Sequence, residues 1–171
     1  MPGYSAIPVV VDACLKGFEG IDLEKVYAAI KESATGDHEP GVMDLMKYGY
    51  IPSDYMAESI ASTMEYAIGD WAIAQLALKL NKLEDYEYFL KRSKSYKNYF
   101  DPDTKFMRGK MSDGSWRSPF DPKSAQHRVN DYCEGNAWQY LWLTPQDPEG
   151  LIELLGGDKG FTSKLDQLFS I

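Results

Sequence analysis

The sequence lacks cysteine and histidine in the arrangements that carry disulfides or local metal sites. Its 171 residues include two cysteines, Cys14 and Cys133, and two histidines, His38 and His127. Neither cysteine lies in a C-x-x-C spacing, and the histidines are far apart in the chain. The sequence therefore excludes a disulfide framework and contains no local zinc-binding motif.

Long apolar runs and an excess of basic residues are also missing. No stretch approaches the roughly 20 apolar residues of a membrane span. The N-terminal Met1-Pro2-Gly3-Tyr4 does not open a charged region followed by an apolar one, so we expect no membrane span and no signal peptide. The 18 Lys and Arg residues against 26 Asp and Glu argue against a nucleic-acid partner. This balance is compatible with a neutral substrate or a bound cation.

The sequence is rich in apolar and aromatic residues. Hydrophobic residues make up 44% of the chain, which is enough for a folded core in a domain of this length. The 12 tyrosines and 4 tryptophans supply rings that suit a core and also suit the faces of sugars. We find no internal repeat and no linker, so we expect one structural unit.

Helical periodicity dominates the chain. The clearest pattern covers 55–81, where Ile60, Met64, Ala67, Trp71, Ala74 and Leu78 predict one continuous apolar stripe. Segment 8–17 is ambiguous between strand and helix. We expect further helices over 22–34 with Asp22 as N-cap, in a short turn near 44–47, and over 83–99, 134–141, 147–155 and 158–170.

One hairpin interrupts this pattern. Asp113-Gly114 is a hairpin turn signal, and it lies between Phe106-Met107-Arg108 and Ser115-Trp116-Arg117. The resulting fold class is mainly α, with antiparallel helix pairs in α/α packing and one β-hairpin.

The most informative window for chemistry is Asp131 to Tyr140. On a helix, Glu134 and Trp138 would share one face, and a carboxyl group beside an indole favours the protonated form of a general acid. The plainer interpretation is a capping or solvated Glu134 with Trp138 in the core. Three acids of the long helix, Glu58, Glu65 and Asp70, fit calcium ligands or, more simply, a solvated face. His127 fits a pocket donor or a loop residue without a role.

The window from Glu134 to Tyr140, EGNAWQY, resembles the signature of glycoside hydrolase family 92, the calcium-dependent exo-acting α-mannosidases. Further blocks resemble the same family in the same order and span nearly the whole chain. They are 6–17, 48–52, 65–75, 100–108, 113–122 and 147–157.

The resemblance implies a fold and an activity. Members carry an N-terminal β-sandwich and a C-terminal (α/α)6 barrel, with the active site between them. They remove terminal α-linked mannose, typically α-1,2-linked, with inversion and with calcium at the sugar hydroxyls. The resemblance makes Glu134 the general acid and Trp138, Gln139 and Asn136 candidates for substrate binding, but it assigns no calcium ligand. It also implies a periplasmic or secreted parent enzyme.

The resemblance also predicts what these residues lack. The family's catalytic base belongs to a later aspartate-containing block, and the β-sandwich precedes the barrel, so we expect 1–171 to be an incomplete (α/α)6 segment. We expect no mannosidase activity from it alone. A non-catalytic α/α module that binds glycan or protein is the alternative. Apolar helix faces exposed by an open arc would favour homo-oligomers.

Overall fold

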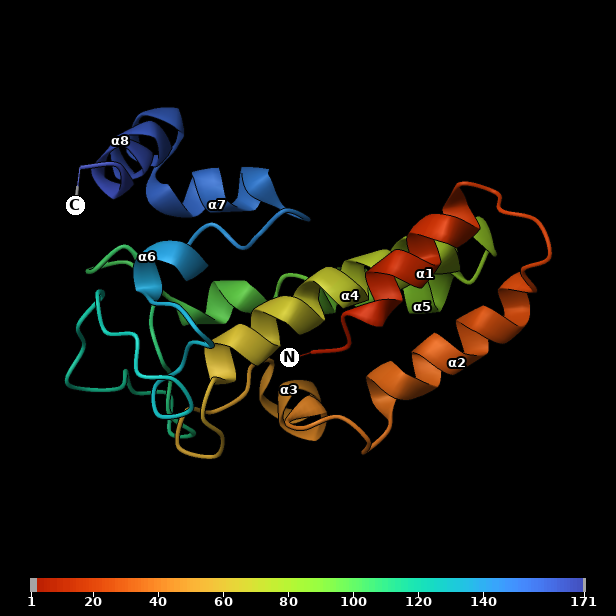
Figure 1. Cartoon of the computed structure of the whole chain (residues 1–171), viewed down its shortest axis with the longest axis horizontal. Helices are drawn as coiled ribbons and strands as arrows, with labels where there is room; N and C mark the ends of the chain where they lie inside the picture. Colours follow the sequence, from red (N-terminus) through yellow and green to blue (C-terminus); the bar gives the residue numbers. More distant parts are fainter. Residues whose placement is uncertain (1–2, 171) are drawn as a thin grey trace.

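The computed structural model describes residues 3–170, which form a mainly helical structure with one short pair of strands (Figure 1). The α-helices are α1 (Ala6–Leu15), α2 (Leu23–Thr35), α3 (Val42–Tyr48), α4 (Ser59–Lys79), α5 (Leu83–Arg92), α6 (Ala137–Tyr140), α7 (Pro148–Leu155) and α8 (Asp158–Leu168). A 3-10 helix, η1 (Ser95–Tyr99), precedes strands β1 (Phe100–Asp101) and β2 (Phe106–Met107). The fold class expected from the sequence is confirmed.

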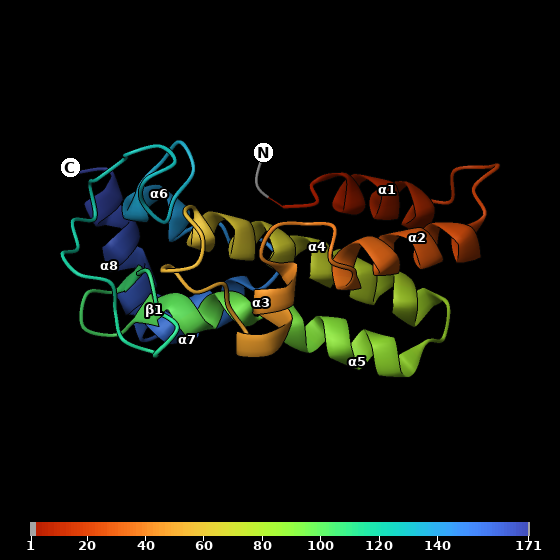
Figure 2. The same cartoon turned by 90° about the horizontal axis from the view of Figure 1, so that it is seen from below.

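Helix α4 is the central element of the fold. It contacts α1, α2, α5 and η1, and Figure 2 shows α1 and α5 on opposite sides of it. Most residues of α4 are buried, and many are small, which lets the neighbouring helices approach closely. The prediction of one apolar stripe is therefore wrong in part. Ile60, Met64, Ala67 and Ala74 are buried, but Trp71 and Leu78 are 38% and 46% exposed.

A buried polar network joins α4 to α5 and to the N-terminal segment. Asp70 is fully buried and accepts two hydrogen bonds from Arg92, each 2.6 Å long, and one of 2.6 Å from the Tyr4 hydroxyl. Arg92 also donates to the carbonyl of Ala34 in α2 at 2.8 Å. The solvated-face interpretation is wrong for Asp70, because this side chain pairs inside the core.

Local sequence signals set three helix ends as expected. Asp22 accepts a hydrogen bond from the Lys25 amide, and Asp147 caps α7 with Pro148 at its first position. Gly156 ends α7 in the left-handed region, at φ 93°. The ambiguous segment 8–17 lies in and just after α1, and the expected helix over 83–99 divides into α5 and η1.

The hairpin differs from the prediction. Phe106–Met107 pairs with Phe100–Asp101 in an antiparallel ladder, not with the segment after Gly114. The Asp113-Gly114 turn exists, closed by the Met111 amide donating to Ser115, but only the Lys110–Trp116 bridge follows it. Within residues 111–115, only Gly114 has a positive φ. This is the arrangement of a turn followed by a glycine bulge, and not of the two-residue turn that the sequence predicted.

The core has two parts that meet along α4. One part packs α1, α2 and α3 against the C-terminal half of α4 and Phe89. The other packs η1, the strands, α6 and α7 around Ile60 and Met64, near the start of α4. Among residues 3–170, no helix combines the length and apolarity that crossing a bilayer requires. Val9, at 70% exposure, and Phe18, at 65%, lie on the outer side of this core; homo-oligomerisation through such faces stays a prediction.

Candidate functional site

The loop that carries Glu134 is fastened to the N-terminal end of α4. The carbonyl of Asp131 accepts hydrogen bonds from the amides of Ile60 and Ala61, both at 3.1 Å, and the Glu58 amide donates to Asn130 at 2.8 Å. The first amides of a helix have no partner within the helix, so this loop supplies one. The position of the loop is therefore fixed by the start of α4.

The Asp131 side chain is a structural anchor. It is buried, and its Oδ1 accepts hydrogen bonds from Arg117 at 2.8 Å and from Ser59 at 3.2 Å. A Cβ atom at Gly109 would lie 2.1 Å from its other carboxylate oxygen, so only glycine fits there. Asp131 thus holds the segments that contain Gly109 and Arg117 against the start of α4.

Glu134 lies in this loop, outside any helix. Its φ is 51°, in the left-handed region, and α6 begins only at Ala137. The prediction of a helix from about Glu134 to Leu141, with Glu134 and Trp138 on one face, is therefore wrong. The helical pattern placed the start of the helix too early. The N-cap is Asn136, two residues after Glu134, and the backbone turns sharply before Asn136.

Glu134 lines a cavity of about 520 Å³. Its side chain is exposed, and among residues 3–170 it takes part in no ion pair. The Glu134 carboxyl group therefore faces the cavity, and within the described residues no lysine or arginine pairs with it. The other lining side chains that carry polar groups include Glu58, Glu65, His127, Arg128, Cys133 and Tyr140.

Asn136 and Gln139 form a capping box at the start of α6. Asn136 Oδ1 accepts from the amides of Trp138 and Gln139, at 3.1 and 3.3 Å, and Gln139 Oε1 accepts from the Asn136 amide at 3.1 Å. The two side-chain oxygens are thus engaged in the cap. Within the described residues, the two side-chain NH₂ groups form no hydrogen bond, so they remain available as donors.

Trp138 lies in the core and not in the lining of the Glu134 cavity. It is 8% exposed, its ring meets Phe106 edge to face at 4.7 Å, and Lys164 Nζ lies 4.4 Å from the ring centroid. Tyr140, which the sequence analysis did not select, lines the cavity instead and donates to the carbonyl of Cys133 at 2.8 Å. Burial raises the pKa of Tyr140 to about 12.

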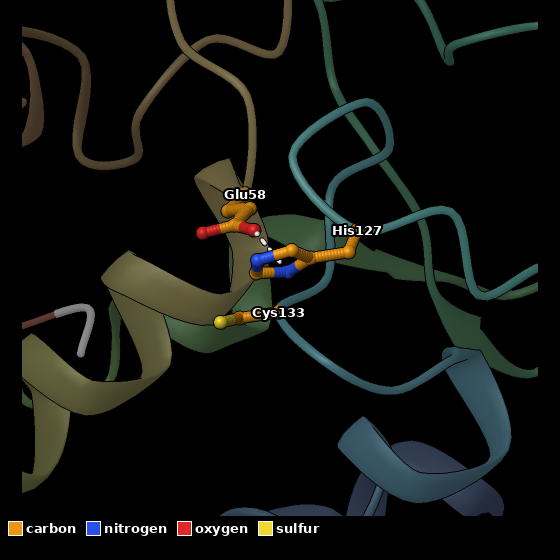
Figure 3. A group of neighbouring side chains, drawn as sticks. All are labelled: Glu58, His127 and Cys133. Atoms are coloured by element: carbon orange, nitrogen blue, oxygen red, sulfur yellow. Dashed lines mark ion pairs between the residues drawn. The ribbon is translucent and has the colours of Figure 1, made fainter.

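Three further lining groups come together that the sequence keeps apart. Glu58 stands at the start of α4, and His127 and Cys133 come from the loop (Figure 3). Burial raises the pKa of the Cys133 thiol, and the nearby Glu58 carboxylate raises it further. No regular spacing links Glu58, His127 and Cys133, so only the fold could bring them together. Burial also raises the pKa of a further lining residue, Glu65.

The one cluster of acidic, histidine and cysteine donors within residues 3–170 does not suit calcium. Calcium takes six to eight oxygen ligands. Among residues 3–170, the single group of three or more neighbouring His, Cys, Asp or Glu donors is Glu58, His127 and Cys133, which offers nitrogen and sulfur as well as oxygen. We therefore derive no step through calcium.

Comparison with known proteins places this chain in a family. The glycosyl hydrolase family 92 catalytic domain matches residues 1–171. A family 92 α-mannosidase from Bacteroides thetaiotaomicron, solved with mannoimidazole, is 42% identical and superposes with a TM-score of 0.95 over 100% of this chain and 23% of its own. An inverting family 92 mannosidase from the same species, strain VPI-5482, is 32% identical with a TM-score of 0.91, over 97% of this chain and 23% of its own.

A curated relative agrees with these structures. An uncharacterized secreted glycosidase from Arthroderma benhamiae is 29% identical over 97% of this chain and 26% of its own length. The chain thus spans about a quarter of the length of the relatives it matches. With a family match over its whole length, the chain belongs to glycosyl hydrolase family 92 and lies within the helical catalytic domain of that family.

Proposed function

We propose that the protein containing this chain removes terminal α-linked mannose from glycans, and that Glu134 protonates the departing oxygen. The observation that carries the proposal is the position of Glu134, which lines the 520 Å³ cavity without an ion-pair partner in the described chain. Membership of a family whose solved members include α-mannosidases supports the choice of substrate.

The proposed reaction is inverting. Such a mechanism uses two carboxyl groups about 6.5–9.5 Å apart, one that protonates the leaving group and one that activates water. We assign the first role to Glu134 and the second to a residue outside 1–171. We propose that 1–171 is part of an (α/α)6 catalytic domain whose remaining helices and partner β-sandwich complete the pocket.

The capping box suits a role beside the acid. Asn136 and Gln139 hold the start of α6 with their oxygens, and we propose that their NH₂ groups donate to sugar hydroxyls. Trp138 then acts from the core, where its packing on Phe106 keeps α6 in place. In this proposal, the side chains that contact the sugar are those of Glu134, Asn136 and Gln139.

The finer features of the activity are also proposals. We propose α-1,2 linkage preference, export to the periplasm or the medium, and calcium assistance with ligands supplied from outside residues 3–170. The description of one relative as a secreted glycosidase supports export.

The decisive experiment compares Glu134→Gln with the unchanged protein in the longer form that also contains the sandwich and the aspartate block. Loss of a general acid costs about 10²–10⁴-fold in rate. An α-mannoside with a good leaving group needs less protonation, so the variant should lose much less activity on it than on a mannose disaccharide. Glu87→Gln, on the exposed side of α5, is the matched control.

Two results would contradict the proposal. One is equal loss on both substrates, which would make Glu134 a binding residue and not an acid. The other is robust mannose release by the purified 171-residue chain, because that chain would then need no second carboxyl group from elsewhere. The reading frame around this segment offers a direct check, since an enzyme requires both missing parts to be encoded beside it.

A further inference from the structure

Glu58, His127 and Cys133 form a compact set of donors on one wall of the Glu134 cavity. One donor atom from each side chain lies within 4.8 Å of the others (Figure 3). Within the set, His127 Nδ1 and Glu58 Oε1 are 3.1 Å apart. All three side chains line the cavity, so a cation held by them would have a side open to it.

The chemistry of this set favours a borderline divalent metal ion. Zinc binds thiolate sulfur, imidazole nitrogen and carboxylate oxygen at about 2.0–2.3 Å, and donors around a tetrahedral ion are then roughly 3.3–3.8 Å apart. The three donor atoms lie within 4.8 Å of one another, so side-chain rotations that change their separations by up to about 1 Å would reach this arrangement. Magnesium and calcium prefer oxygen ligands, so they suit the set poorly.

The backbone holds the donors in place. Glu58 and Arg128 both have a left-handed φ, at 58° and 60°, and the Arg128 amide donates to Glu58 Oε1 at 3.0 Å. Non-glycine residues adopt this conformation at a cost and usually only where the surroundings enforce it. The Glu58 side chain is only 18% exposed, whereas that of His127 is 44% exposed. The carboxylate is therefore fixed, and the imidazole stands where an ion from solvent reaches it.

We propose that Glu58, His127 and Cys133 bind a zinc ion, with the fourth position open to the cavity beside Glu134. Cys133 binds as the thiolate and releases its proton to solvent. Three protein ligands and one open position is the arrangement of zinc sites that exchange a water or a ligand. The site is separate from the calcium of the proposed function, and its test does not depend on mannosidase activity.

The test uses the unmodified chain and two metal probes. Zinc is measured by equilibrium dialysis with elemental analysis, and cobalt by the charge-transfer absorption that a thiolate ligand produces. We expect one ion per chain and a thiolate band. Cys133→Ser should abolish the band, and Cys133→Ser and His127→Gln should each weaken zinc binding by at least about tenfold. Cys14→Ser and His38→Gln are matched controls, because those residues are not part of the set.

A second measurement covers variants that fail to fold. In the unmodified chain, zinc should slow the alkylation of Cys133, and excess calcium should not restore it. The proposal is overturned by an absence of bound zinc, by equal zinc affinity in Cys133→Ser or His127→Gln, or by displacement of zinc by calcium. An alkylation rate that zinc does not change would also overturn it.

Discussion

Asp70 and Arg92 form a two-pronged ion pair between α4 and α5, with Nε to Oδ2 and Nη2 to Oδ1 both at 2.6 Å. Asp70 is fully buried, and the Arg92 side chain is 7% exposed. The pair is closed off by the Tyr4 hydroxyl and the Ala34 carbonyl. Four segments of the chain therefore meet at one buried ion pair.

Removing this carboxylate should destabilise the fold strongly. Asp70→Asn leaves the Arg92 charge buried without its partner, and we expect a loss of about 3–5 kcal/mol in the free energy of unfolding, measured by urea denaturation. Asp12→Asn is the control, because the Asp12–Lys16 pair is exposed and should contribute little. Equal effects of the two substitutions would contradict this account.

Gly69 should resist replacement by alanine. In a helix interior alanine is favoured over glycine by about 1 kcal/mol. However, a Cβ atom here would lie 2.4 Å from the Tyr4 ring, and such overpacking costs about 1–3 kcal/mol. We therefore expect Gly69→Ala to lower the midpoint of urea denaturation. In a Tyr4→Ala background the same change should become neutral or stabilising; a loss of the same size there would show that the ring is not the cause.

Substitutions in the capping box can test the proposed sugar contact separately from the helix cap. Asn136→Asp and Gln139→Glu keep the capping oxygens but remove the NH₂ donors, so stability should change little while kcat/KM of the longer enzyme for mannosides falls. Asn136→Ala, which removes the cap, should lower the free energy of unfolding by about 1 kcal/mol. Unchanged kcat/KM in both isosteric variants would exclude sugar binding by these amides.

Stability should fall in alkali because of the buried tyrosines. Burial raises the pKa of Tyr66, Tyr99 and Tyr132 above the ordinary value of about 10. Above pH 10 the unfolded chain loses these protons and the folded chain keeps them, so each tyrosine lowers the free energy of unfolding by about 1.4 kcal/mol per pH unit. Below pH 10 both states keep the protons and the contribution is complete.

Tyr132→Phe isolates one of these protons. The variant loses the hydrogen bond to the Met107 carbonyl, so its stability at pH 8 should be lower by about 1 kcal/mol. Between pH 10 and 11, however, its stability should fall less steeply than that of the unchanged chain, by about 1 kcal/mol over this interval. Urea titrations at several pH values measure both quantities, and parallel curves would contradict the assignment.

The sequence predicted the features that depend on local patterns. The N-caps at Asp22 and Asp147, the glycine end of α7 and the helical class follow from short-range chemistry. Asp70 was misread, because its partners Tyr4 and Arg92 lie far from it in the chain. The Asp113-Gly114 turn exists, but Phe106–Met107 pairs with Phe100–Asp101, which precedes it in the sequence, and not with the segment after the turn.

The candidate site was predictable only in part. The resemblance directed attention to Glu134, Asn136 and Gln139, whereas periodicity placed Glu134 wrongly on a helix because the left-handed turn before Asn136 leaves no trace in hydrophobic spacing. Glu58 and Cys133 are 75 positions apart in the sequence, and only the docking of the loop onto α4 makes them neighbours.

That docking has a dynamic consequence. The Asp131 carbonyl is the partner of the Ile60 and Ala61 amides, so the loop with Glu134 cannot lift away without exposing two helix amides. Local opening of the site and fraying of α4 should then occur as one event, and hydrogen exchange at Ile60 and Ala61 would report it. Ligands that hold this loop closed would slow that exchange from a distance, even where they never touch the helix.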